Sequence, residues 1–339
     1  MRSFHCFAGV LIATIAMACT TFDDAEVDAK PSSDAPPAPG ATKDTQGATI
    51  EAGTNDDGAG PHPTPDGGSA APDANGEGGN TQVPPGSCGT TNPPTGFVAG
   101  NSLKVGTATR TYALDVPANY DGTKRYPLVI GYHGDGGSGA AYRSSMPIHS
   151  QGANDAIFVW PNGTNDNQGH SFDQNDDPPN NKDVTYFDTL VAALATTYCV
   201  DGARIYVHGM SGGAYFTNQL GRWRATAIRA IAPHSGGGPF GIQSSDFDKT
   251  GSLTVNGSVA AFIVHGQSDT TVPIAEGQKS LTYWRNADGA ATGQAATSPS
   301  PCQKQNGGSK AVVFCAIPGL AHNVWSGAPA AVWQFFSTN

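Results

Sequence analysis

The sequence predicts an α/β domain in which a mostly parallel sheet is covered by helices on both faces. Short apolar runs alternate with segments of helical periodicity from about residue 110 to residue 336. The runs at 128–132, 156–160 and 260–264 are almost wholly apolar, which is typical of strands buried on both faces. Helices between such strands act as crossovers and imply parallel neighbours.

The expected elements follow one another in a regular order. A strand of period two at 110–116 precedes the buried strands 128–132 and 156–160. A helix begins at Asp183, and its apolar residues recur at steps of three and four as far as Tyr198. A strand at 205–208, a helix after residue 211 and apolar strands at 228–232 and 260–264 come next. A helix at 274–285, a strand at 311–317 and a short helix at 330–336 complete the domain.

Residues 1–19 have the pattern of a secretory signal. Arg2 precedes an apolar stretch at 7–18, which is too short for a membrane-spanning helix. Cleavage after Ala18 fits an Ala-x-Ala site, whereas Cys19 in the next position fits a bacterial lipoprotein site. We expect lipid attachment to Cys19, with plain secretion as the alternative.

Residues 20–87 form an acidic segment rich in Pro, Gly and Ala, with almost no large apolar residues, so it cannot bury enough surface to fold. Its 12 acidic residues and two lysines give a net charge of −10, the same as that of the whole 339-residue chain. Residues 88–339 are therefore nearly neutral and carry no basic stripe for nucleic acid. We expect a disordered linker followed by one catalytic domain at 88–339, in a monomer.

A β-rich run at 204–208 leads into Gly-x-Ser-x-Gly, with Gly209, Ser211 and Gly213, and then into a helix-compatible stretch. A sharp strand-to-helix turn can hold a serine only if its neighbours lack bulky Cβ substituents. The turn exposes the hydroxyl, and the helix behind it directs N–H groups and a positive dipole end toward a reacting carbonyl. Ser211 is therefore the candidate nucleophile of an α/β-hydrolase. Because the motif also arises by chance in a chain with 44 Gly, the other triad members decide the case.

In this fold the acid and then the histidine follow the serine along the chain. His322 lies in a loop after the apolar run 311–317 and is the candidate base. Asp269 follows the apolar run 259–264, which brings it to the carboxyl edge of the sheet, and is the candidate acid. Asp288, at the expected end of a helix, is the alternative acid and is more typical of a turn.

The strand at 126–132 runs into a glycine-rich loop at 133–137. Such a loop lets backbone N–H groups approach a ligand closely. We expect the oxyanion to be bound by the amide of Gly212 and by that of Gly134 or Asp135. An ordinary glycine turn is the alternative for the loop.

A polar insert rich in Asn and Asp separates Trp160 from Asp183. It leaves the carboxyl end of a strand, the side on which open α/β sheets bind ligands. We expect Trp160 and Phe172 to offer aromatic surfaces to a substrate. The alternative is a solvated loop whose aromatic side chains belong to the core. The acidic residues of the insert match no metal-ligand spacing, and we expect no metal.

Four cysteines lie in the expected domain: Cys88, Cys199, Cys302 and Cys315. An even number in an exported domain favours disulfides over a metal site. Three pairings are possible. The short polar loop between Cys302 and Cys315 favours a local bridge, which would leave Cys88 for Cys199.

Three stretches of the chain resemble the secreted feruloyl esterase and polyhydroxybutyrate depolymerase group of α/β-hydrolases. They are Val-Pro-Ala-Asn-Tyr-Asp at 116–121, Tyr-Pro-Leu-Val at 126–129 leading to the glycine-rich loop, and Tyr-Cys-Val-Asp at 198–201 before the serine motif. The resemblance covers about residues 88–339 and implies a Ser211, Asp269 and His322 triad and a Cys88–Cys199 bridge. Relatives often carry Trp-Pro sooner after the histidine than this chain does, a departure that bears on the shape of the acyl pocket.

The resemblance implies a secreted serine esterase that works through an acyl-enzyme without a cofactor. We expect feruloyl and related hydroxycinnamoyl esters on plant cell-wall polysaccharide as substrates, because the chain ends soon after His322 and leaves no room for the surface-binding domain of polymer-film depolymerases. A polyhydroxybutyrate depolymerase acting on polyester and an acetylxylan esterase are the alternatives within the group. A serine peptidase and a non-catalytic binding protein are alternatives of another class. We expect an extracellular protein, either secreted or an outer-membrane lipoprotein, that binds no nucleic acid and meets the membrane only through lipid on Cys19.

Overall fold

The structure is a computed structural model that describes residues 88–89, 93–166, 169–255 and 257–339. The predicted signal, the lipidation site at Cys19 and the linker at 20–87 lie outside the described residues. None of the helices in the described part of the chain combines the length and apolarity needed to span a bilayer.

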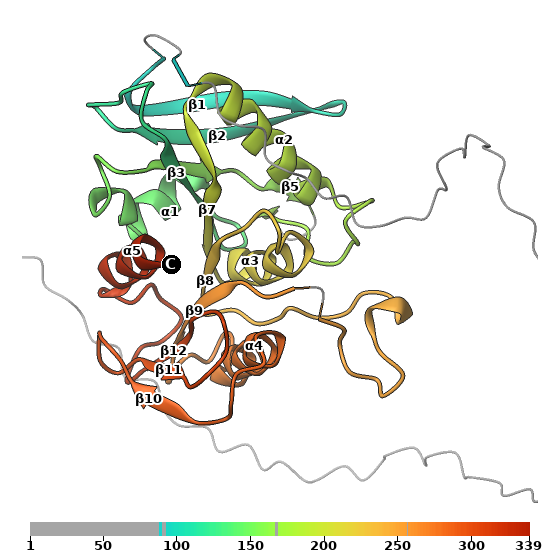
Figure 1. The fold of residues 1–339 in the computed structure, drawn as a ribbon. Helices are drawn as coiled ribbons and strands as arrows, with labels where there is room; N and C mark the ends of the chain where they lie inside the picture. The colour runs from blue at the N-terminus through green and yellow to red at the C-terminus, as the bar shows by residue number, and fades with distance from the viewer. Residues whose placement is uncertain (1–87, 90–92, 167–168, 256) are drawn as a thin grey trace, which may run out of the picture. The chain divides into compact units, whose positions relative to one another are not determined.

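A ten-stranded mixed sheet forms the centre of the domain (Figure 1). In spatial order its strands are β1 (Gly96–Val105), β2 (Ala108–Val116), β4 (Ile157–Pro161), β3 (Tyr126–Tyr132), β7 (Val200–Met210), β8 (Ala230–His234), β9 (Ala260–Gly266), β12 (Val312–Ile317), β11 (Gln303–Gln305) and β10 (Gln294–Ala296). The middle strands, from β4 to β12, are all parallel to one another. The outer strands β1, β2, β11 and β10 pair antiparallel.

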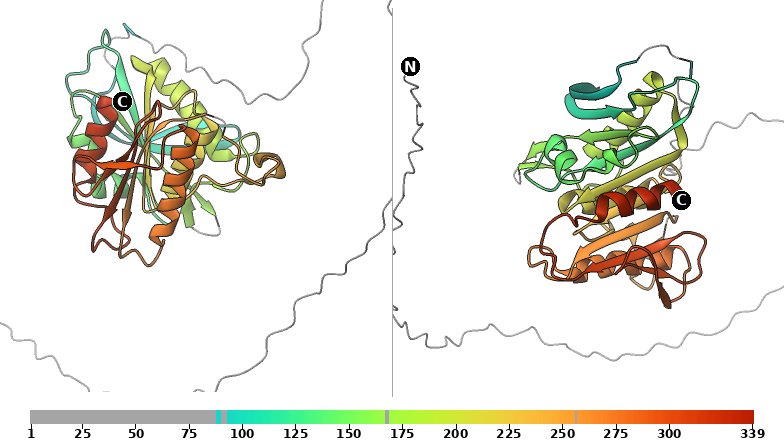
Figure 2. Two further views of the ribbon diagram at one scale, coloured as in Figure 1. Left: turned by 60° about the horizontal axis from the view of Figure 1, so that its bottom comes forward. Right: turned by 90° about the vertical axis from the view of Figure 1, so that its left-hand side faces the viewer.

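Helices cover both faces of this sheet, and apolar side chains from alternating positions of the strands meet them. On one face α2 (Lys182–Thr197), α3 (Gly212–Trp223) and α4 (Ile274–Ala287) pack on a cluster that includes Ile130 and Val207. On the other face α1 (Gly139–Ser145) and α5 (Ala328–Thr338) pack on a cluster that includes Val129 and Tyr206. Figures 1 and 2 show α5 and α4 on opposite sides of the strands. The predicted fold class, an α/β-hydrolase with a mostly parallel sheet, is confirmed.

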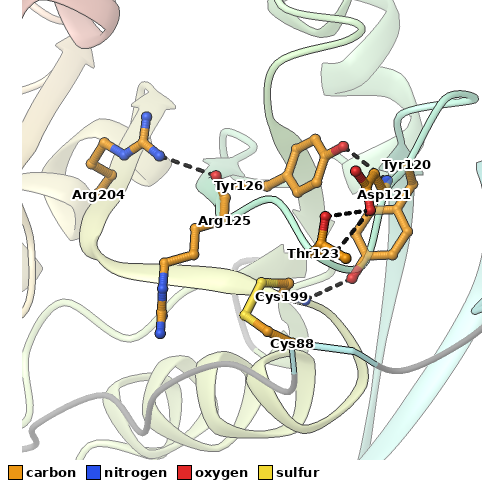
Figure 3. Close-up of a disulfide and its surroundings, with 8 residues drawn as sticks. All are labelled: Cys88, Tyr120, Asp121, Thr123, Arg125, Tyr126, Cys199 and Arg204. Carbon is orange, nitrogen blue, oxygen red and sulfur yellow. Dashed lines mark hydrogen bonds between the residues drawn. A yellow bond between two sulfur atoms is a disulfide. The ribbon is translucent and has the colours of Figure 1, made fainter.

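A disulfide between Cys88 and Cys199 ties the first described residues to the start of β7 (Figure 3). Cys199 also donates its backbone N–H to the Tyr120 hydroxyl at 2.7 Å, and Tyr120 stacks on Tyr126 at a centroid distance of 5.1 Å. A second disulfide joins Cys302, next to β11, to Cys315 in β12. Both bridges fit an extracellular protein.

Several elements were not expected from the sequence. β1 adds an antiparallel edge, α1 follows the glycine-rich loop, and β10 and β11 form a hairpin against β12. A small hairpin of β5 (Thr164–Asp166) and β6 (Gly169–Ser171) lies in the polar insert, and two short 3-10 turns, η1 (Ile148–Ser150) and η2 (Ser244–Asp246), complete the elements of the described residues. β8 begins and ends two residues later than predicted, so that it extends to His234.

Candidate active site

Ser211 occupies a strained backbone conformation between β7 and α3. Its φ of 55° and ψ of −124° lie in a region that residues with side chains rarely adopt. Its amide donates to the carbonyl of His234 at 3.0 Å, and its own carbonyl accepts from Ala214 and Tyr215 in the first turn of α3. The hydroxyl therefore lies at the positive end of the α3 dipole, beside the carboxyl ends of the parallel strands.

The two glycines of the serine motif are required by the close approach of backbone to backbone. A Cβ on Gly209 would lie 2.3 Å from the carbonyl oxygen of Gly213. A Cβ on Gly213 would lie 2.2 Å from the carbonyl oxygen of Tyr132, at the end of β3. Either contact is far shorter than van der Waals distance, so only glycine lets β7, α3 and β3 meet behind Ser211.

The structure brings Ser211, His322 and Asp269 together in one hydrogen-bonded chain. His322 Nε2 lies 2.9 Å from Ser211 Oγ, and His322 Nδ1 lies 2.7 Å from Asp269 Oδ2. Because an ionised carboxylate only accepts, Nδ1 carries the proton toward Asp269 and Nε2 presents its lone pair to the serine hydroxyl. This is the tautomer that a general base needs.

Asp269 is almost fully buried in the turn that follows β9, and this turn stabilises its negative charge. Burial by itself raises the pKa of this carboxyl, but hydrogen bonds from His322 and from the backbone of Val272 and Thr271 outweigh it and hold the pKa below its ordinary value. The amides of Thr271 and Val272 donate to Oδ1 at 3.0 and 2.9 Å, which leaves Oδ2 for the imidazole. The carboxylate is thus ionised at neutral pH and aimed at His322.

Two buried histidines adjoin this chain of hydrogen bonds. His234 accepts from the amide of Trp325 at 2.9 Å, so it holds the loop that carries His322. Burial, with the neighbouring His265 and His322, lowers the pKa of His234 to about 3. The Nε2 atom of His265 lies 2.9 Å from the carbonyl oxygen of Val272 and 3.7 Å from Asp269 Oδ2. The sequence indicates a role for neither histidine, because buried histidines at strand ends resemble ordinary core residues.

The glycine-rich loop after β3 lies directly against the serine. A Cβ on Gly134 would lie 3.1 Å from Ser211 Cβ, and a Cβ on Gly212 would lie 2.2 Å from Asp135 Oδ1. His133 holds the loop, because its Nδ1 lies 2.7 Å from the Gly134 carbonyl and its Nε2 accepts from the amide of Gly163 at 3.0 Å. Gly134, Asp135 and Gly212 are thus adjacent to Ser211, as an oxyanion-binding loop requires.

Two cavities adjoin the serine hydroxyl, and Asp135 and Ser211 line both. The larger, of about 670 Å³, lies toward α2 and α3; its walls include Phe172, Tyr215 and Val272. The smaller, of about 380 Å³, lies toward α1; its walls include Tyr142, Met210 and His322. An ester has two arms, and each arm can occupy one cavity.

The structure corrects the expectation for Trp160. Its side chain is 0% exposed in the core beneath α1, and its Nε1 donates to Asp115 Oδ2 at 2.7 Å. Trp160 therefore lines neither cavity, because α1 covers its ring and the Tyr142 ring packs edge-on against it at a centroid distance of 6.0 Å. Phe172 does line the larger cavity, although it is only 2% exposed and stacks on Phe216 at a centroid distance of 5.5 Å.

Asp288, the alternative acid, lies away from the serine and stabilises a turn. Its Oδ1 accepts from the amides of Ser309 and Lys310 at 3.0 and 2.8 Å. Among the described residues, no cluster of His, Cys, Asp and Glu has the arrangement of a metal site.

Curated proteins with related sequences include several feruloyl esterases. The feruloyl esterase C of Emericella nidulans is 27% identical over 243 residues, which cover 67% of this chain and 83% of the relative. A probable feruloyl esterase C of Aspergillus niger is also 27% identical, over 246 residues with the same coverage. No family model matches the chain.

Among solved structures, the acetyl xylan esterase of Aspergillus awamori superposes with a TM-score of 0.55 at 17% sequence identity. The match covers 70% of this chain and 98% of that enzyme and supports the fold. Taken with the sequence relatives, it identifies the chain as an α/β-hydrolase and carboxylic ester hydrolase that is homologous to the feruloyl esterases.

Proposed function

We propose that this chain is an extracellular serine esterase that hydrolyses hydroxycinnamoyl esters of plant cell-wall polysaccharide. The observation that carries the proposal is the position of His322, within hydrogen-bond distance of both Ser211 Oγ and Asp269 Oδ2. A histidine oriented in this way can remove the serine proton as the hydroxyl attacks a carbonyl carbon.

The reaction follows from this geometry in two halves. Ser211 Oγ attacks the ester carbonyl while His322 Nε2 accepts its proton, and Asp269 stabilises the resulting imidazolium. The imidazolium then returns the proton to the departing alcohol oxygen, and an acyl-enzyme remains on Ser211. Water, deprotonated by His322, attacks the acyl carbon, and the serine regains its proton as the carboxylic acid leaves.

Backbone amides stabilise the negative charge that develops on the carbonyl oxygen. We assign one donor to Gly212, at the N-terminus of α3, and a second to Gly134 or Asp135. The donors are preorganised, since His133 holds the loop and the strained turn holds Gly212. Loss of one such donor typically costs about 10²- to 10³-fold in kcat.

The proposed substrate class rests on the relatives, which are named feruloyl esterases. The sequence similarity extends over most of their length. The two cavities beside Ser211 are together large enough for an aromatic acyl group and a sugar. We propose further that the protein is exported with lipid on Cys19, and that residues 20–87 tether the catalytic domain.

A substrate panel tests the proposal. Methyl ferulate, methyl caffeate, acetylated xylan, polyhydroxybutyrate and 4-nitrophenyl acetate are compared by kcat/KM with wild-type protein and with Ser211→Ala. We expect turnover of the hydroxycinnamates and 4-nitrophenyl acetate, and at least about 10⁴-fold loss in the variant, because the proposed acyl-enzyme forms on Ser211. The exposed Ser337→Ala is the matched control and should leave all rates unchanged.

The outcomes separate the alternatives. Turnover of acetylated xylan without turnover of hydroxycinnamates would indicate an acetyl esterase. Turnover of polyhydroxybutyrate would indicate a depolymerase. Faster hydrolysis of a matched anilide than of the ester would indicate a peptidase. Full activity in a folded Ser211→Ala protein would reject the serine mechanism.

A further inference from the structure

The larger cavity beside Ser211 carries an excess of negative charge. Its lining includes the carboxylates of Asp135, Asp173 and Asp176, and Lys182 supplies the positive charge among its described lining residues. Part of any ester bound at Ser211 on this side faces these groups.

The segment that supplies two of these carboxylates is held by a buried polar network. Asp183 is 1% exposed, accepts the amide of Asp173 at 2.7 Å and pairs with the Arg110 guanidinium at 2.5 Å. Asn181 is 0% exposed and donates to the carbonyls of Asp173 and Asp176 at 3.0 and 2.9 Å. These contacts anchor the acidic segment to the start of α2, so its charges occupy a defined place at the cavity.

The two carboxylates of this segment lie close to one another. Asp173 Oδ1 accepts the amides of Asn175 and Asp176 at 2.9 and 3.1 Å, which folds the segment back on itself. The proximity of Asp173 raises the pKa of Asp176 from its ordinary value. The α3 side chain Gln219 further ties the segment by donating to the carbonyl of Gln174 at 3.2 Å.

We propose that Asp135, Asp173 and Asp176 are specificity-determining residues that select against esters carrying a negative charge in the part bound in this cavity. This inference rests on the proposed esterase function. Neutral polysaccharides would then be preferred over those rich in uronic acids as carriers of the ester. Coulomb repulsion of a monoanion by about two net negative charges across a solvated cavity corresponds to roughly a fivefold reduction in kcat/KM.

Matched pairs of probes that differ by one charge test the proposal. Caffeoylquinic acid carries a carboxylate in its alcohol part, and its quinate methyl ester is neutral. Mono-4-nitrophenyl adipate carries a carboxylate in its acyl part, and its methyl ester is neutral. The pair that responds shows which half of the ester lies in the cavity. For each pair the ratio of kcat/KM, neutral over anionic, is measured at 20 mM and 500 mM salt by release of caffeic acid or 4-nitrophenol.

Three variants isolate the effect of the cavity. The double variant Asp173→Asn and Asp176→Asn keeps the Oδ1 acceptors of the segment but removes both charges. Asp176→Asn alone is the second variant, in case the double variant does not fold. Asp155→Asn makes the same charge change at an exposed site that borders neither cavity and serves as the matched control.

For the wild type we expect a ratio of kcat/KM, neutral over anionic, of about five or more in at least one pair. The double variant and high salt should each reduce this ratio at least about twofold, and Asp155→Asn should leave it unchanged. Equal rates for both members of both pairs, or a ratio that the double variant leaves intact, would overturn the proposal. Failure to hydrolyse any caffeoyl ester would refute the hydroxycinnamoyl assignment, and the adipate pair would then decide the charge selection alone.

Discussion

The substitution Asp269→Asn gives the sharpest test of how the site works. Asp269 Oδ1 accepts two backbone amides, from Thr271 and Val272, whereas Oδ2 accepts from His322 Nδ1 at 2.7 Å. In the variant the amide oxygen takes the place of Oδ1, because only an oxygen can accept from those amides. The side-chain NH₂ then faces Nδ1 and donates to it.

This exchange reverses the tautomer of His322. With Nδ1 as the acceptor, the proton moves to Nε2, which would point its N–H at Ser211 Oγ instead of a lone pair. The serine could no longer lose its proton to the imidazole. The corresponding change in a Ser-His-Asp triad lowers kcat by about 10⁴-fold, which is about 5.5 kcal/mol of transition-state stabilisation. The fold should survive, since the replaced group has nearly the same shape.

Steady-state kinetics on 4-nitrophenyl acetate and methyl ferulate measure the effect, and circular dichroism and the melting temperature verify the fold. Asp288→Asn is the matched control, because Asp288 also accepts two backbone amides but lies away from the serine. Its kcat should stay within about twofold of wild type. A folded Asp269→Asn protein with more than a tenth of the wild-type kcat would refute the assigned role of the carboxylate.

Three further predictions concern the fold that supports the site. Gly213→Ala places a methyl group 2.2 Å from a β3 carbonyl oxygen, so we expect at least about 100-fold loss of kcat/KM and a lower melting temperature; near-normal kinetics would contradict the packing. Burial lowers the pKa of His208, in β7, and of His234 to about 3. Both histidines therefore stay neutral in the folded state, whereas in the unfolded chain they bind protons below about pH 6.5. Urea titrations should therefore show that the free energy of unfolding falls by about 2 kcal/mol per histidine as the pH is lowered from 6.5 to 5. A free energy of unfolding that stays the same over this range would contradict the prediction. The Cys88–Cys199 bridge joins residues 111 positions apart, and removing it with Cys88→Ala and Cys199→Ala should cost about 4 kcal/mol of stability. The value of kcat at 20 °C should stay unchanged, because the bridge lies at the far end of β7 from the serine.

The sheet and its helices could be predicted because each central strand contains a run of apolar residues. Such runs are buried on both faces, and their separation by helices implies the parallel order. β1 escaped prediction because none of its residues is buried and most are polar or small, so its few apolar residues give no clear period of two. α1 has seven residues and buries only Gly139 and Tyr142, too few to give a helical period.

The residues of the candidate triad could be named from their order along the chain, because each lies just after a predicted strand. The direction of a side chain across a strand is harder to infer. Trp160 ends an apolar run whose residues are buried on both faces, so the sequence does not show which face its ring takes. Its hydrogen bond to Asp115, 45 positions away, joins two strands that no local pattern pairs.

The role of the additional histidines follows from the protonation state that the site requires. His234 Nε2 can accept the amide of Trp325 only while the ring is neutral, and a protonated ring would lose this link to the loop of His322. It would also place a second positive charge beside the imidazolium that forms during catalysis, and so oppose proton transfer from the serine. Burial prevents this by lowering the pKa of His234 to about 3, and it lowers that of His265 as well. Among these three neighbours His322 alone has a partly exposed side chain. In the proposed mechanism the ring that takes the proton from Ser211 is therefore also the ring that borders the substrate cavity.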